Sequence, residues 1–184
     1  MNHNMARDAT NSDLAVVMFS GHGAIVDGQL YLLPYNVDAS TPSHLKVSAI
    51  GANELRAELA ELANHGRVLV FLDACHSGAV TGDGTQIVPS ANPLRSALVA
   101  SNVTVLTSSD ADEVSHEDKQ WGHGAFTKVL LEALGRDADT NNDGLVSMSE
   151  LTAYLSRRVP ELTGGHQHVG LSQGFQRELF VAGL

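Results

Sequence analysis

The sequence has 184 residues, of which 43% are hydrophobic and 17% are charged, and this composition is typical of one globular domain with its own core. Its net charge of −10 argues against nucleic acid as a partner, because phosphate binding needs a basic face. No apolar run approaches the ~18 residues of a membrane span, the N-terminus shows no apolar signal region, and the single cysteine excludes a disulfide framework. These features predict a cytoplasmic protein that has no membrane partner.

The first third of the chain alternates apolar runs with turn and helix patterns. We expect residues 1–12, which are polar, to form a disordered tail, followed by one domain at residues 13–184. The elements predicted next are, in chain order, a strand at Leu14–Phe19, a turn with a short β run at Asp27–Asp38, a loop broken by Pro34 and Pro42, and an amphipathic helix at Ile50–His65.

A continuous apolar run, Val68–Leu72, comes next and lacks polar alternation. Such a run is typical of a strand buried on both faces of a parallel sheet. Cys75 follows just past the carboxyl end of this strand, which is the edge of an open α/β sheet where ligands and chemistry collect. A lone cysteine is most often an inert buried residue, but its position here favours a reactive thiol.

His22 stands in the same position relative to the first predicted strand. If the two strands are parallel neighbours about 5 Å apart, their carboxyl ends bring His22 and Cys75 within reach. A histidine beside a cysteine is a common way to activate the thiol. Gly21 and Gly23 flank the histidine, and glycines leave backbone N–H groups accessible to a developing oxyanion.

The remaining elements complete an α/β pattern. In chain order they are a mobile loop rich in Gly and Pro at Thr81–Ser96, a strand at Val103–Thr107, an acidic loop at Asp110–Asp118, helices at Phe126–Leu134 and Ser147–Arg158, and a last strand at Glu178–Val181. Strands that alternate with helices predict a largely parallel sheet.

Two short motifs resemble the catalytic motifs of the caspase-like cysteine peptidases, which include caspases, metacaspases and prokaryotic caspase homologues. They are S-G-H-G at Ser20–Gly23 and D-A-C-H-S-G at Asp73–Gly78, and 53 residues separate the histidine from the cysteine, close to the spacing of about 50 in caspases. The resemblance covers about Asp13–Tyr154 and includes H-G-A-F-T at His123–Thr127. It implies a three-layer α/β/α fold with a mostly parallel sheet.

The chain departs from the resembled family at its start. Caspase-like domains carry a strand, a helix and a second strand before the histidine motif, whereas this sequence begins almost at that motif. The resemblance therefore implies an N-terminally truncated sheet. Its open edge would be filled by a partner chain or by a second copy in a homo-oligomer, or would remain exposed, or the fold would be reduced and its activity impaired.

The resemblance implies peptide-bond hydrolysis through an acyl-enzyme, with a polypeptide as the substrate. Cys75 is the expected nucleophile and His22 the general base and acid, while the backbone N–H groups of Gly23 and Cys75 are expected to hold the oxyanion. His76, beside the nucleophile, is expected to be structural because adjacent residues point apart. No organic cofactor is implied.

The residues expected to bind substrate are Asp73, Ser20 and Asp112, the last in an acidic stretch without arginine. Metacaspase-like enzymes carry Asp at the position of Asp73 and prefer basic residues, and a buried carboxylate pairs well with a guanidinium. We therefore expect cleavage after Arg, then Lys, with Arg95 as a candidate self-processing site. The alternative for Asp73 is a structural cap on the following turn.

A second motif at Asp139–Glu150 matches the EF-hand calcium loop. The expected Ca²⁺ ligands are Asp139, Asn141, Asp143, the carbonyl of Leu145, and Glu150. The alternative is a loop closed by its own Asx turns, because EF-hands usually occur in pairs and only one is present.

Two further histidines, His166 and His168, lack spaced partners for zinc and are expected to lie in a loop. Three functional classes thus remain open. They are a cysteine endopeptidase, a truncated or inactive caspase homologue that serves as an interaction or assembly subunit, and a calcium-responsive regulatory domain.

Overall fold

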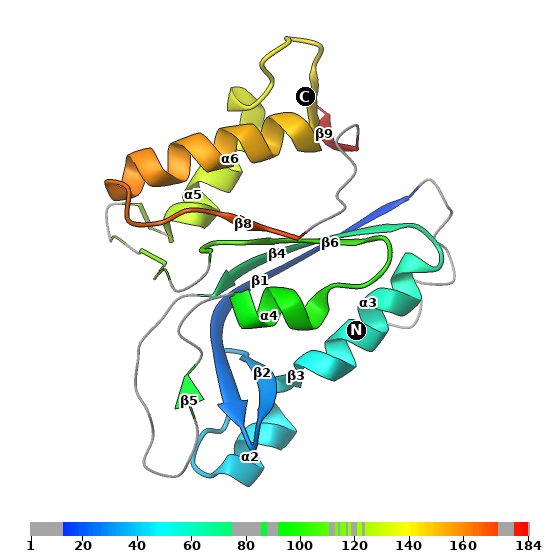
Figure 1. Ribbon diagram of the computed structural model, residues 1–184, viewed down its shortest axis with the longest axis vertical. Helices are drawn as coiled ribbons and strands as arrows, with labels where there is room; N and C mark the ends of the chain where they lie inside the picture. The colour runs from blue at the N-terminus through cyan, green and yellow to red at the C-terminus, as the bar shows by residue number, and fades with distance from the viewer. Residues whose placement is uncertain are drawn as a thin grey trace.

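The computed structural model describes residues 13–74, 86–87, 92–110, 113, 115–116, 118, 121–122, 124–172 and 179–183. These residues form three layers, with α3 and α4 on one face of a central sheet and α5 and α6 on the other (Figure 1). The three-layer α/β/α prediction is confirmed.

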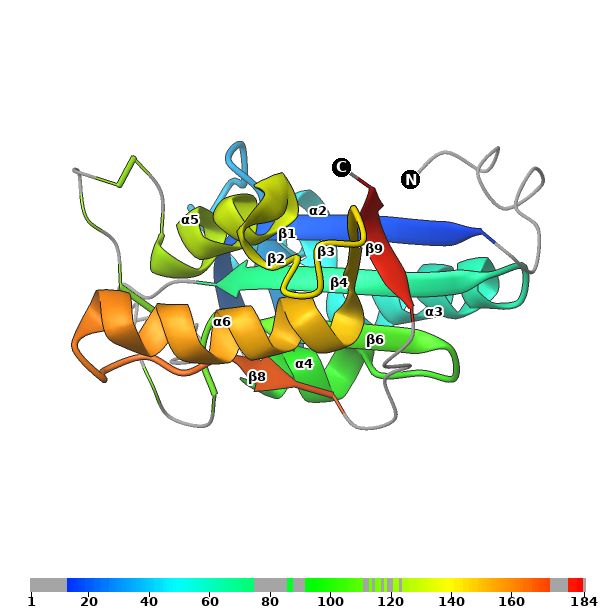
Figure 2. The same cartoon turned by 90° about the horizontal axis from the view of Figure 1, so that it is seen from above.

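Three parallel strands form the centre of the sheet: β1 (Leu14–Val26), β4 (Arg67–Ala74) and β6 (Val103–Thr107). Shorter antiparallel strands flank them, which are β2 (Gln29–Leu33), β3 (Ile50–Gly51), β5 (Gln86–Ile87) and β8 (Gly170–Leu171). The order is β3-β2-β1-β4-β6-β8, and β5 pairs with β1. The view in Figure 2 shows β1, β4 and β6 side by side beneath α5 and α6.

The continuous apolar run in β4 has the physical cause that the sequence indicates, since both of its faces are buried. Leu69 and Phe71 pack in the core under α5 and α6, while Val68, Val70 and Leu72 pack in the core over α3 and α4. A strand between two helical layers has no solvent face and therefore no polar alternation.

β1 is longer than predicted, and His22 lies within it rather than beyond its end. Its first half pairs with β4, and from His22 onward it pairs with β2 across a hairpin. The hairpin turns at Asp27 and Gly28, whose φ angles are 49° and 75°. An Asp-Gly pair suits a two-residue turn because both positions need positive φ.

Two helices form where loops were expected. α2 (Pro42–Ser48) begins at Thr41, whose side chain accepts a hydrogen bond from His44 N, so Pro42 starts a helix rather than breaking a loop. α4 (Asn92–Leu98) lies in the stretch predicted to be a mobile loop. Leu94 and Leu98 are fully buried, and their packing overrides the loop-like composition.

The other helices follow the sequence pattern more closely. α3 spans Ala52–Ala63, because Ile50 and Gly51 of the predicted helix instead pair with β2. α5 (Ala125–Glu132) continues as the π-helix η1 (Ala133–Asp137), and α6 spans Met148–Thr163. The last predicted strand forms as β9 (Phe180–Gly183), but it pairs with β7 (Leu145–Ser147) outside the main sheet.

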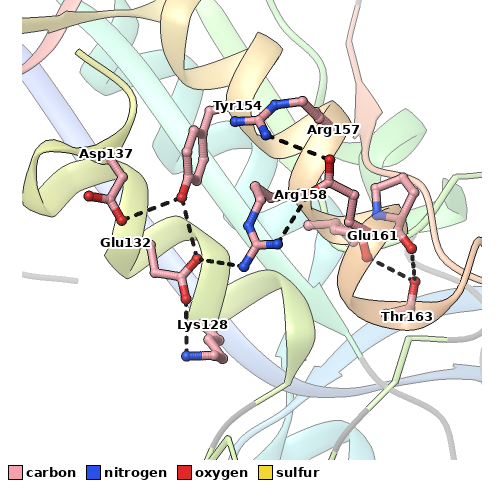
Figure 3. Close-up of polar contacts among 10 residues, drawn as sticks. Lys128, Glu132, Asp137, Tyr154, Arg157, Arg158, Glu161 and Thr163 are labelled. Atoms are coloured by element: carbon pink, nitrogen blue, oxygen red, sulfur yellow. Dashed lines mark hydrogen bonds and ion pairs between the residues drawn. The ribbon is translucent and has the colours of Figure 1, made fainter. Parts of the chain in front are cut away.

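A polar network connects α5 and η1 to α6 on the molecular surface (Figure 3). Glu132 receives Lys128 Nζ at 3.0 Å, Arg158 Nη2 at 3.8 Å and the hydroxyl of Tyr154 at 3.5 Å. Arg158 also binds Glu161 at 3.0 Å. Beneath this network the two helices share an apolar core, which supplies most of their attraction.

The described helices include none with the length and apolar character needed to cross a membrane.

Candidate active site

The carboxyl ends of β4 and β6 meet the middle of β1, where its pairing with β4 ends, at one edge of the parallel part of the sheet. Ser20 lies opposite Asp73, Gly21 opposite Ala74, and Leu72 opposite Thr107. This is the edge at which open α/β sheets place their ligands. It is also the edge to which the two predicted catalytic motifs lead.

His22 and Cys75 are the next residues after the paired positions Gly21 and Ala74. His22 is exposed, and Gly23 beside it is buried. Cys75, like His76 and Gly78, lies outside the described residues.

Asp73 is 1% exposed and makes a defined contact with α5. Its Oδ2 accepts a hydrogen bond from the hydroxyl of Thr127, in the first turn of the helix. A Cβ added at Gly124 would lie 2.9 Å from the same oxygen, so the backbone before α5 passes directly against the carboxylate. The described contact of Asp73 is therefore with a helix distant in sequence.

Ser20 is exposed beside the buried Asp73, on the neighbouring strand. Asp112, the third residue expected to bind substrate, lies outside the described residues. The structure thus brings together two of the three residues predicted to bind substrate, Ser20 and Asp73.

The connection from β6 to α5 lies at the same edge and is held by residues that the sequence analysis missed. We call it the β6–α5 connection, described at residues 108–110, 113, 115–116, 118 and 121–122. Within it the hydroxyls of Ser108 and Ser115 are 2.6 Å apart, and both are buried. The side chain of Gln167, from the segment after α6, contacts Ser108 and His116. Nothing in its local sequence, G-G-H-Q-H, marks Gln167 as buried.

A family model described as the caspase domain, of peptidase family C14, matches residues 2–180. The chain belongs to the caspase domain family. A comparison with curated proteins gave no match. Caspase domains are cysteine peptidases, and membership supports that general activity for this chain.

In this caspase domain, Arg95 does not lie in a loop as the self-processing hypothesis assumed. It is part of α4, its side chain is 17% exposed, and its guanidinium lies 2.9 Å from Asp110. Its guanidinium also lies directly against Gly170. A helical, ion-paired arginine is a poor substrate, because proteolysis needs an extended and accessible backbone.

The EF-hand-like loop is closed by its own side chains. Asp139 accepts hydrogen bonds from the backbone N–H groups of Asp143 and Gly144, at 3.3 and 3.1 Å. Asn141 accepts one from Asp143 N at 2.8 Å, and Asp143 accepts one from Leu145 N at 2.8 Å. These are the Asx turns of the alternative hypothesis.

Glu150, the last expected calcium ligand, caps α6. Its Oε2 accepts from the N–H and hydroxyl of Ser147, and its Oε1 accepts from the N–H and hydroxyl of Thr140 at 3.0 Å. These hydrogen bonds, those of Ser147 first, lower the pKa of Glu150 to about 2. The described residues contain no group of three His, Cys, Asp or Glu side chains arranged to hold a metal ion. Calcium binding at this loop stays a prediction.

The two histidines after α6 lie in a loop, as expected, and both contact the β6–α5 connection. The Nδ1 of His168 lies 2.8 Å from Glu113 Oε1, and the rings of His166 and His116 are 5.9 Å apart. These contacts fasten the segment after α6 to the sheet edge that carries the site.

Proposed function

We propose that this caspase domain is a cysteine endopeptidase with a His22/Cys75 dyad that cleaves after Arg and, less readily, after Lys. The observation that carries the proposal is the register of β1 and β4, in which Gly21 lies opposite Ala74. The residue that follows Gly21 carries the imidazole that acyl transfer requires, and the residue that follows Ala74 carries the thiol. Membership in the caspase domain family supports the same chemistry.

In the proposed reaction, His22 accepts the thiol proton while the sulfur of Cys75 adds to the scissile carbonyl. The N–H groups of Gly23 and Cys75 hold the negative oxygen of the tetrahedral intermediate. Collapse of this intermediate breaks the C–N bond, and the imidazolium returns the proton to the leaving amine. Water then adds to the thioester with His22 as the base, which releases the acid and regenerates the thiol.

The preference for a basic residue rests on Asp73. This carboxylate is buried beside the exposed Ser20 of the neighbouring strand, and a buried carboxylate pairs well with a guanidinium. Arg suits such a site better than Lys because its planar fork can bind both oxygens. The net charge of −10 also attracts basic peptides.

The dyad is tested by Cys75→Ala and His22→Ala, with His65→Ala as a control at a histidine in the turn between α3 and β4, at the opposite end of β4 from Asp73. We expect both site variants to lose hydrolysis of arginyl peptides and the control to keep it. Labelling by an irreversible arginyl electrophile should also disappear in Cys75→Ala. Unchanged hydrolysis by Cys75→Ala would refute the assignment as a cysteine peptidase.

Specificity is tested separately with fluorogenic peptides that differ only at the residue before the scissile bond. We expect Arg above Lys and no cleavage after Asp, and Asp73→Asn should weaken the preference for Arg. A preference for Asp would overturn the assignment of the pocket while leaving the dyad intact.

A second candidate function, that of an assembly subunit, is favoured by one observation on β1. Val16 and Met18 are 51% and 46% exposed on one face of the strand. Among the described residues, Leu14–Gly21 pairs only with β4. We propose a second copy as the occupant, because antiparallel pairing of two such edges about Val17 sets Val16 of one copy opposite Met18 of the other and buries both.

Sedimentation of the wild type and of Met18→Lys tests this candidate, with Val47→Lys as a control because Val47 is exposed on α2, which packs against the other half of β1. We expect a dimer that Met18→Lys alone dissociates. A monomeric wild type at high micromolar concentration would exclude it.

A further inference from the structure

Gln167 is an unusual residue to find fully buried. Its Nε2 donates to the carbonyl of Ser108 at 2.6 Å, and its Oε1 accepts from the N–H of His116 at 2.7 Å. Removing an amide from water is unfavourable unless its polar atoms find partners. Here both partners are backbone groups of one connection, at its start and its middle, and neither belongs to the segment of Gln167 itself.

These two hydrogen bonds set the distance between Ser108 and His116 within the β6–α5 connection. Ser108 follows β6 directly, and its N–H donates to Leu72 O of β4 at 2.8 Å, which fixes that end to the sheet. His116 lies midway along the connection, and its carbonyl accepts from Ala125 N, at the start of α5, at 2.9 Å. A single side-chain amide therefore holds the sheet edge and the approach to α5 at a fixed separation.

The contact continues to the candidate pocket. α5, whose first residue binds His116, carries Thr127, which donates to the buried carboxylate of Asp73. The connection itself carries Asp110 and Glu113, and Glu113 is held by the N–H and ring of His168, next to Gln167. The β6–α5 connection and, through His116, the start of α5 are thus fastened to the segment after α6.

We propose that Gln167 is a positioning residue that shapes the substrate-binding side of this active site. The inference rests on the proposed peptidase function. The hydrogen bonds of Gln167 go to Ser108 and His116, not to Asp73 or His22. Its loss should therefore act on peptide binding and leave the reactivity of the thiol unchanged, since misplacing a binding group lowers affinity without altering the nucleophile.

The test compares Gln167→Met, which keeps the length of the side chain and removes both hydrogen bonds, with Gln29→Met at an exposed glutamine of β2. We expect Gln167→Met to raise KM for an arginyl peptide about tenfold, the effect of losing one or two buried hydrogen bonds, with a smaller change in kcat. Alkylation of Cys75 by iodoacetamide should stay within about twofold of the wild type. Gln29→Met should change none of these.

A second readout does not depend on activity. Trp121 is the only tryptophan of the sequence and belongs to the β6–α5 connection. Its backbone N–H donates to Asp118 O at 3.0 Å. We expect acrylamide to quench Trp121 fluorescence more strongly in Gln167→Met than in the wild type or in Gln29→Met. If no peptide is hydrolysed by any form, the proposed function fails, but this measurement still tests the positioning role.

Gln167→Glu is a second variant for this test, chosen because it preserves the shape of the side chain. A protonated carboxyl has the same shape as the amide and can both donate to Ser108 O and accept from His116 N, whereas the ionised form repels that carbonyl. We expect Trp121 to be quenched as in the wild type at low pH and more strongly as pH rises. If Gln167→Met does not fold, Gln167→Glu still tests the positioning role of Gln167. KM and Trp121 quenching equal to those of Gln29→Met, or no pH dependence in Gln167→Glu, would overturn the proposal.

Discussion

Thr127, in the first turn of α5, donates a hydrogen bond to the buried carboxylate of Asp73, two residues before Cys75 in the sequence. Fifty-four residues separate the two partners. The contact ties the helix that covers the sheet to the strand that leads to the expected nucleophile. It gives the H-G-A-F-T motif a physical role that its letters do not reveal.

Replacing Thr127 by Val should therefore affect both stability and activity. The variant keeps the shape of the side chain but leaves a buried carboxylate without this donor, which costs about 1–3 kcal/mol. We expect Tm to fall by about 5 °C and kcat/KM for arginyl peptides to fall about tenfold. Thr127→Ser, which keeps the hydroxyl, should restore most of both, and a Val variant equal to the Ser variant would contradict this role.

Gly170 should not tolerate a methyl group. A Cβ at this position in β8 would overlap Arg95 Nη1 and the hydroxyl of Thr107, which is itself buried and bonded to Ser109 O. We expect Gly170→Ala to lower the free energy of unfolding by about 1–3 kcal/mol, the usual cost of overpacking. Gly135→Ala in η1 is the control, because nothing lies within 4 Å of the added atom. Equal denaturation midpoints for the two variants would disprove the clash.

The cap of α6 should make stability depend on pH. Hydrogen bonds from Ser147 and Thr140 lower the pKa of Glu150 to about 2 from an ordinary value of 4.5. A carboxylate with a depressed pKa contributes stability above its unfolded value, and this is lost as pH falls through the folded value. We expect Glu150→Gln to lose about 1 kcal/mol near pH 7, and this difference from the wild type should shrink between about pH 4.5 and pH 2.

Chemical denaturation across this range measures the effect, with Glu58→Gln on the exposed face of α3 as a control. The same variant addresses calcium, since binding would require Glu150 to leave Ser147 and Thr140. If calcium binds there, it should raise the Tm of the wild type and not that of Glu150→Gln.

The surface network between α5 and α6 should contribute little to stability but should change the ionisation of Tyr154. Burial, followed by the charges of Asp137 and Glu132, raises the pKa of Tyr154. Glu132→Gln removes one of these charges, so the pKa should fall, as measured by tyrosinate absorbance with Tyr31 and Tyr35 replaced by Phe. The loss of stability should be about 1 kcal/mol or less, because the pairs are partly exposed.

Glu161→Gln is the matched control, because Glu161 pairs with Arg157 and Arg158 but does not contact Tyr154. An unchanged tyrosine titration in Glu132→Gln would show that the carboxylate does not act on the phenol.

The sequence alone determined the central strands, the spacing of His22 and Cys75, and the family. β4 and β6 could be predicted because a strand buried on both faces must be apolar throughout, which is a local signal. The paired motifs could be predicted because each follows such a strand. Local pattern did not predict that β1 continues past His22, because that depends on its pairing with β2, nor that α4 forms where the composition is loop-like.

Only the tertiary structure decided which side chains support the site. Thr127 meets Asp73, and Gln167 meets Ser108 and His116, across 51 to 59 residues of chain. A polar residue that will be buried looks in sequence like one that will be solvated, because its partners are backbone groups and carboxylates supplied by distant elements. The free energy of these contacts comes from burial, which exists only once the layers have packed.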